Sequence, residues 1–191
     1  MKRSLTSGID LQLDLSFTGA NQDVLAQLSD QPTKSSLIEA APWEKALREW
    51  IHFIRSDNSL HCPESVRKTL VVSMGLQFTD DKNITFLNST WCGKSEKTDV
   101  LSFPIIDDKI IVPKDQSIEL GDIVVSLITA EQQAMEQKHT LEEELRWLVS
   151  HGLLHLLGWE HPNPQSLKAM LCCQEQLLCI DGNLPTNGGN E

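Results

Sequence analysis

Three histidines near the end of the chain share a spacing that strongly limits how the segment around them can fold. They lie in HGLLHLLGWEHP with the pattern H-x3-H-x5-H, as His151, His155 and His161. Leucines at helical spacing, with no proline among them, predict a helix that starts near Thr140 and stops at Gly158. Side chains four residues apart lie on one helical face, so two imidazoles can bind one metal ion. The turn that follows would bring the third histidine to the same ion.

The donor set indicates the kind of metal. Three neutral nitrogens from one short segment predict one zinc ion per chain with an open fourth position, as in catalytic sites, whereas structural zinc is usually closed by thiolates. The alternative interpretation is three unrelated histidines in a buried helix and its exit loop, and the shared spacing favours metal. Metzincin proteases have a similar pattern, with a general-base glutamate where this chain has Gly152. Peptide hydrolysis is therefore disfavoured, unless Glu144 or Glu160 replaces that base.

Charge and cysteine content narrow the class of protein. The net charge of −11 argues against a broad nucleic-acid-binding surface, and no DNA partner is expected. Five cysteines and the absence of an apolar run long enough for export or membrane spanning predict a cytoplasmic protein without a membrane partner.

Hydrophobic periodicity predicts the fold class. Alternating apolar and polar residues predict four strands, at residues 9–17, 70–78, 98–104 and 121–126. Apolar stripes at helical spacing predict helices at residues 42–55, 81–91, 130–137, 140–157 and 165–180, with Asp80, Thr129 and Thr140 as caps. This order predicts a single α+β domain over residues 1–181, in which a mixed sheet of about four strands packs against helices and the metal-site helix is central.

Three segments of the chain are predicted to lie outside regular structure. Residues 18–41 are polar and are interpreted as a solvated connector, although a short helix near 24–28 is an alternative. Residues 107–114 predict a turn between two strands of a hairpin, and residues 182–191 predict a disordered tail.

Three carboxylates are candidates for supporting the metal ligands. Glu144 lies seven residues before His151 on the same helical face, where it could orient that ligand, although a solvated acid is the alternative. Glu160 is next to a ligand in the sequence, and Asp122 lies near the start of a predicted strand from which it could hydrogen-bond a histidine.

The motifs together resemble those of the YbeY family. The resemblance lies in HGLLHLLGWEHP at 151–162, LNSTWCGKSEKTDVLSFP at 87–104 and LGDIVVS at 120–126, and extends over about residues 43–180. It implies a zinc-dependent endoribonuclease that cuts single-stranded RNA, processes the 3′ end of small-subunit ribosomal RNA and acts with the ribosome in its quality control. It also implies that the three histidines are the zinc ligands, and that residues 18–41 are an insertion.

The chain departs from the family pattern at two positions. Glu160 replaces the usual aspartate before the third histidine, which is a conservative change. Asn88 and Trp91 match the family's N-x-x-[YW]-R segment, but Cys92 replaces its arginine. A thiol cannot bind a phosphate as a guanidinium does. Either Lys94 or another cation supplies the charge, or cleavage is weakened, or the position matters little. The candidate residues for binding the substrate are Asn88, Lys94 and Lys97. A non-catalytic ribosome-associated protein with structural zinc therefore stays an alternative.

Overall fold

A four-stranded mixed sheet organises the molecule, of which the computed structural model describes residues 11–29, 37–106 and 117–180. Its strands are β1 (Gln12–Thr18), β2 (Val71–Thr79), β3 (Val100–Pro104) and β4 (Ile118–Ser126). They lie in the order β1-β2-β4-β3, in which β1, β2 and β4 are parallel and β3 is antiparallel to β4. The predicted pairing of the last two strands is confirmed, whereas the predicted turn and tail lie outside the described residues.

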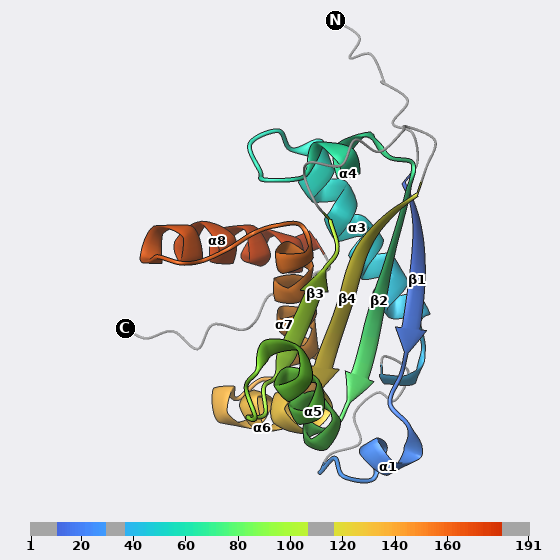
Figure 1. Cartoon of the computed structure of the whole chain (residues 1–191), viewed down its shortest axis with the longest axis vertical. Coiled ribbons are helices and arrows are strands. Elements are labelled where there is room, and N and C mark those ends of the chain that lie inside the picture. Colours follow the sequence, from blue (N-terminus) through green and yellow to red (C-terminus); the bar gives the residue numbers. More distant parts are fainter. Residues whose placement is uncertain (1–10, 30–36, 107–116, 181–191) are drawn as a thin grey trace, which may run out of the picture.

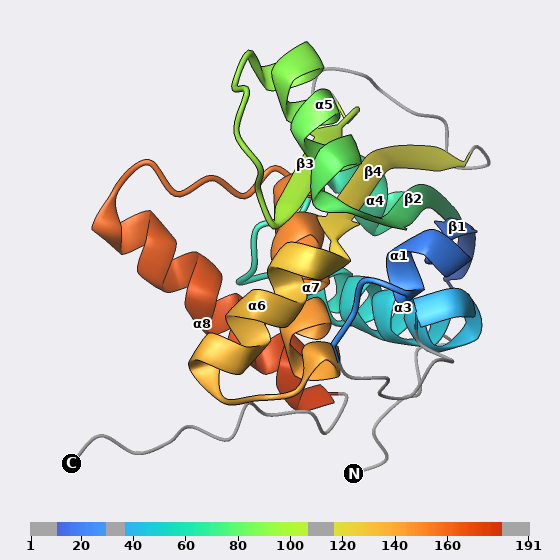
Figure 2. The same cartoon turned by 90° about the horizontal axis from the view of Figure 1, so that it is seen from below.

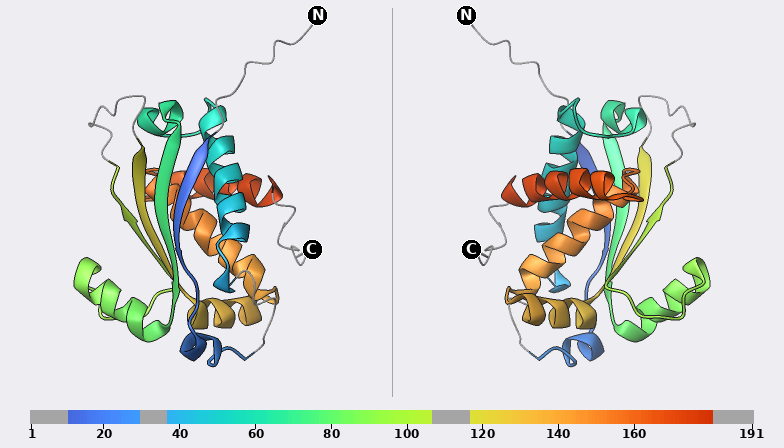
Figure 3. Two further views of the ribbon diagram at one scale, coloured as in Figure 1. Left: turned by 90° about the vertical axis from the view of Figure 1, so that its right-hand side faces the viewer. Right: turned by 90° about the vertical axis from the view of Figure 1, so that its left-hand side faces the viewer.

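The helices are distributed unequally over the two faces of the sheet. One face is covered by α3 (Ala41–Ser56), α6 (Leu127–Gln137) and α7 (Leu141–Leu156), and α8 (Pro164–Ile180) packs on α7 and α3 on the same side. The other face is open apart from one end, where α5 (Asp81–Cys92) lies (Figures 1 and 3). The short helices α1 (Gln22–Leu25) and α4 (Glu64–Lys68) lie at opposite ends of the sheet (Figure 1). The predicted α+β class is confirmed, and α7 is its central helix, in contact with β3, β4, α6 and α8.

Side-chain alternation along β2 explains why one face is covered. Every second residue is buried toward the helices: Val72, Met74, Leu76 and Phe78. The Phe78 ring meets Trp43 of α3 edge-to-face, with centroids 5.3 Å apart. The intervening Ser73, Gly75 and Gln77 have small or polar side chains. On this face β2 itself therefore offers no apolar stripe for a helix to cover. No helix in the described part of the chain is long and apolar enough to cross a membrane.

The interpretation of residues 18–41 as a solvated connector is wrong where the structure describes them. Val24, Leu28 and Leu37 are buried in the main core, and the short helix that was the alternative is present as α1. The Ser29 backbone N–H also donates to the Glu131 carboxylate of α6 at 2.8 Å. Widely spaced apolar residues in a polar segment have no periodicity to reveal them, so their burial depends on tertiary contacts. That the segment is an insertion stays a prediction.

Helix caps were predicted correctly for two helices and wrongly for one. Asp80 caps α5 and Thr140 caps α7, the latter in a capping box with Glu143. Helix α6 starts earlier than predicted, because the cap is the Ser126 hydroxyl, which accepts from the Thr129 backbone N–H. Strand β4 therefore leads directly into α6.

Candidate metal centre

Helix α7 presents two of the three histidines side by side. Its apolar face packs under the sheet, and His151 and His155 lie one turn apart beside that face, both partly buried. Their Nε2 atoms are 3.2 Å from each other. The helical spacing seen in the sequence thus places two nitrogen donors at one point, as predicted.

A glycine turn brings in the third histidine. Gly158 takes a positive φ of 83°, which an L side chain rarely adopts, and its N–H donates to the His155 carbonyl at 2.9 Å. The turn is held from outside because the Trp159 indole N–H donates to the His61 carbonyl at 3.0 Å. The His161 ring then lies with its centroid 5.5 Å from that of His151.

The three side chains meet closely enough to hold one ion. One nitrogen from each of His151, His155 and His161 lies within 4.8 Å of the others. Zinc binds imidazole nitrogen at about 2.0–2.1 Å, so donors at this separation fit around a single ion. No other group of three histidine, cysteine or acidic side chains within such reach occurs among the described residues. The arrangement could therefore bind a metal ion, and the donor set is the one that suits zinc.

Burial favours the protonation state that a metal needs. Removal from water lowers the pKa of both His151 and His155, and the neighbouring histidines lower that of His151 further. Neutral imidazoles keep a lone pair free for an ion. The two rings are therefore poised as ligands.

Gln174 of α8 positions the His151 ring, and it lies outside the segment whose spacing predicts the metal site. Its Oε1 lies 3.3 Å from His151 Nδ1, and its Nε2 donates to the Trp147 carbonyl at 2.7 Å. Because that amide donation assigns Oε1 as the acceptor, the proton of His151 belongs on Nδ1 and Nε2 is left for an ion. The sequence contained a signal, because Gln174 is a polar residue at helical spacing within the apolar stripe of α8. The structure shows that it is fully buried.

The three carboxylates proposed as supports lie in different places. Glu160 Oε1 is 4.0 Å from His155 Nδ1, at the site although largely exposed. Glu144 does not orient a ligand, because its carboxylate pairs with His139 instead. Seven residues of helix correspond to a rise of about 10 Å, so a shared face does not bring Glu144 to His151.

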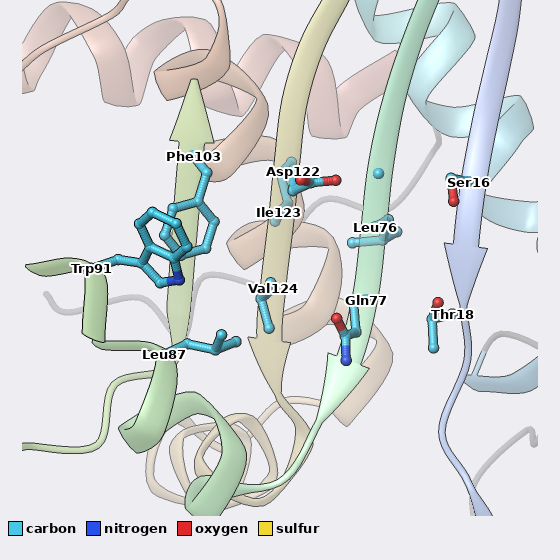
Figure 4. A pocket seen from close by; sticks show the side chains of 11 residues that line it. Ser16, Thr18, Leu76, Gln77, Leu87, Trp91, Phe103, Asp122, Ile123 and Val124 are labelled. Atoms are coloured by element: carbon cyan, nitrogen blue, oxygen red, sulfur yellow. The ribbon is translucent and has the colours of Figure 1, made fainter. Parts of the chain in front are cut away.

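Asp122 also does not contact a ligand histidine, because it lies on the opposite face of the sheet. The next residue, Ile123, faces Gly152 of α7, so the alternation along β4 turns Asp122 away from the histidines. Figure 4 shows it pointing from β4 toward β2, on the face that also carries Trp91 and Phe103. These residues line an open groove with a volume of about 460 Å³. The Asp122 carboxylate occupies the space that a Cβ at Gly75 would need, since Oδ1 lies 2.0 Å from that position.

Comparison with known proteins decides the family. A family model described as "Endoribonuclease YbeY" matches residues 28–180.

The chain belongs to the YbeY family.

Curated relatives match it over nearly their whole length. "Endoribonuclease YbeY" of Prochlorococcus marinus (strain MIT 9313) is 56% identical over 179 residues, which cover 94% of this chain and 96% of that protein. The protein of the same name from Synechococcus sp. (strain CC9311) is 48% identical over 174 residues, covering 91% and 98%. The solution structure of TM1509 from Thermotoga maritima aligns with a TM-score of 0.49 at 19% identity, covering 93% of this chain and 100% of that one.

In this YbeY-family chain, two residues proposed to bind substrate have structural contacts of their own. The Asn88 amide is buried and donates to the Glu96 carbonyl at 2.8 Å, which closes the loop after α5. The Lys97 ammonium pairs with Asp81 at 2.8 Å. Lys94 is exposed on the same loop, beside the exposed Cys92 that ends α5. Of the two lysines, Lys94 is therefore the one available to a ligand.

Gly152, where a metzincin would have its general base, faces the sheet. A Cβ at Gly152 would lie 3.0 Å from Ser102 Oγ of β3 and 3.0 Å from Ile123 Cγ2 of β4. A glutamate at this position would be directed against the sheet and would collide with these atoms. The glycine is thus a packing requirement of this fold.

Proposed function

We propose that this protein is a zinc-dependent endoribonuclease that cuts single-stranded RNA. The observation that carries the proposal is a cluster of three histidine nitrogens within 4.8 Å, in a chain whose family model is described as an endoribonuclease. Two relatives that match more than nine-tenths of this chain carry the same name. Both point to phosphodiester hydrolysis at the C-terminal end of α7.

In this proposal one zinc ion per chain is held by His151, His155 and His161. When bound, zinc would supply Lewis acidity toward a phosphate oxygen and lower the pKa of bound water. The chain's own part is orientation: Gln174 fixes the proton of His151 on Nδ1, and Glu160 lies beside Nδ1 of His155. A divalent cation also offsets part of the net charge of −11 near the site, which helps an anionic substrate to approach.

The substrate we propose is the 3′ end of small-subunit ribosomal RNA. We infer a role with the ribosome in RNA processing and quality control, in the cytoplasm, with neither DNA nor a membrane as partner. The family resemblance supports this assignment. Lys94, with support from the loop that Asn88 and Lys97 stabilise, would contact the RNA backbone in place of the arginine that Cys92 replaces.

The test is cleavage of one RNA sequence in single-stranded and duplex form. Wild type should cut the single strand, lose activity with EDTA and regain it with zinc. His155→Ala should lose cleavage, whereas His52→Ala, an exposed histidine of α3, should keep it. Cys92→Arg should cut faster if the missing guanidinium limits catalysis.

Two other outcomes would overturn the proposal. Zinc-bound wild type that leaves RNA intact, with normal ribosomal RNA processing in a strain carrying His155→Ala, would favour a non-catalytic protein. EDTA-sensitive digestion of casein without RNA cleavage would indicate a protease.

A further inference from the structure

A second cavity lies between α6, α7 and the start of β3. Its volume is about 390 Å³, and its lining includes Asp99, Gln133, His139, Glu144 and Trp147. Helix α6 packs against α7 (Figure 2), and α6 supplies Gln133 while α7 supplies Glu144 and Trp147. The proposed endoribonuclease mechanism does not use any of them.

The cavity adjoins the metal centre. Trp147 precedes His151 by one turn of α7, and its carbonyl shares the Gln174 side chain with that histidine. Four residues of helix rise by about 6 Å, comparable with the distance from a phosphate to its own base. Asp99 is near enough to both regions to favour the charged form of His151 and to raise the pKa of Glu144.

The polar groups of the cavity are mainly acceptors. Glu144 binds His139 through Oε2, and no hydrogen bond to its Oε1 occurs in the described part of the chain. Asp99 Oδ2 accepts from the Gln133 amide at 2.9 Å, while Gln133 Oε1 is buried without a partner among the described residues. The buried Gln133 Oε1 without a partner costs free energy that an N–H donor of a ligand would recover, and Glu144 Oε1 offers a second acceptor beside it.

The charge of the cavity selects which part of a nucleotide can enter. Two carboxylates repel a phosphate, whereas the adjacent histidine cluster, with its cation, attracts one. A base can enter between an indole and an acceptor-rich wall, in the way that proteins bind the unstacked bases of single-stranded RNA. Guanine is the RNA base whose pairing edge presents two adjacent donors, N1–H and the N2 amino group.

We propose that this cavity is a subsite for a guanine base next to the scissile phosphate, read by Glu144 with Gln133 and stacked near Trp147. The inference rests on the proposed endoribonuclease function and adds a sequence preference to it. Uracil fits poorly, because its two carbonyl oxygens would face the carboxylates.

The test measures binding of fluorescent 2′-O-methyl pentanucleotides by anisotropy, with strand integrity checked afterwards. The central nucleotide of AAXAA carries guanine, hypoxanthine (as inosine), adenine or uracil. Hypoxanthine differs from guanine in lacking the N2 amino group. Wild type should bind guanine about tenfold more tightly than inosine or uracil, the size of one good base contact. Glu144→Gln, which keeps the shape but replaces an acceptor with a donor, should reduce that ratio to within about twofold.

Matched controls separate the subsite from general damage. Glu142→Gln changes an acid of the same helix that pairs with Arg146 outside the cavity, so the guanine preference should persist. Gln133→Leu should lose the preference, while Gln132→Leu, an exposed glutamine of α6, should keep it. These pairs keep the test decisive if one cavity variant folds poorly.

Each result separates this inference from the proposed function. Cleavage of RNA without a guanine preference, or with one that Glu144→Gln leaves unchanged, overturns the subsite but not the nuclease. A preference that depends on Glu144 in a protein that does not cut RNA supports the subsite and overturns the nuclease. GMP that binds as tightly as the oligonucleotide would identify a free nucleotide as the ligand and contradict the RNA subsite, as would no binding at all.

Discussion

The candidate metal centre and the cavity beside it share α7 but are built in different ways. All three histidines of the metal centre come from residues 151–161, and their meeting depends on helical spacing and one glycine turn. The cavity combines side chains of α6 and α7 with Asp99, the residue before β3, and their meeting depends on how these elements pack. A site within one segment can therefore be read from sequence, whereas a site assembled from several elements needs the fold.

The largest expected effect tests the packing of α7 on the sheet. Gly152→Glu should lower the free energy of unfolding by about 3–5 kcal/mol, because a carboxylate would be forced against Ser102 and Ile123 without a partner. Urea denaturation measures this, with Gly152→Ala as a milder comparison since its methyl group needs a smaller adjustment. Full stability of the glutamate variant would mean that position 152 does not face the sheet, and the protease alternative would return.

The next effect tests whether α8 contributes to the metal centre. Gln174→Leu should weaken zinc binding about 10–100-fold, or about 1.4–2.7 kcal/mol, because His151 loses the group that orients it. Competition with a chelator measures the affinity. Gln176→Leu, exposed on the same helix, should bind zinc as wild type does. Equal zinc affinities of wild type and Gln174→Leu would mean that α8 does not contribute to zinc binding.

A smaller effect concerns the pH dependence of the cavity. Burial raises the pKa of Glu144 above 4.5, and Asp99 acts in the same direction, although His139 opposes it. The folded state therefore binds a proton more readily than the unfolded state, so this group's contribution to stability is present below pH 4.5 and lost as pH rises through the raised pKa. Glu144→Gln cannot titrate at this position. The unfolding free energy of wild type should therefore fall relative to that of the variant as the pH rises from about 4 to about 7. Denaturation across this range would contradict the account if the difference stayed constant or reversed.

The smallest effect concerns the loop after α5. Asn88→Ala should cost about 1 kcal/mol of stability, because the Glu96 carbonyl loses its donor. Ser89→Ala, exposed on the same helix, should cost less. An Asn88 variant with unchanged stability but weaker RNA binding would instead make this residue a direct contact.

The sequence predicted what depends on local geometry and missed what depends on packing. The Thr140 cap, the Gly158 turn and the four-stranded sheet follow from periodicity and backbone preference, and all are present. Asp122 was misplaced, because alternate residues of β4 point to opposite faces of the sheet. Only the fold shows that Ile123, and not Asp122, faces α7. Glu144 was misplaced because a common helical face does not imply contact over two turns.

The central claim is that one short segment forms the metal site, and metal content tests it most directly. The zinc bound by the purified full chain would be measured for wild type and for His151→Ala, His155→Ala, His161→Ala and His52→Ala. We expect about one zinc per chain in wild type and in His52→Ala, and a loss of at least about a hundredfold in affinity in each of the other three. Zinc retained at wild-type affinity in those three variants, or absent from wild type, would contradict the account.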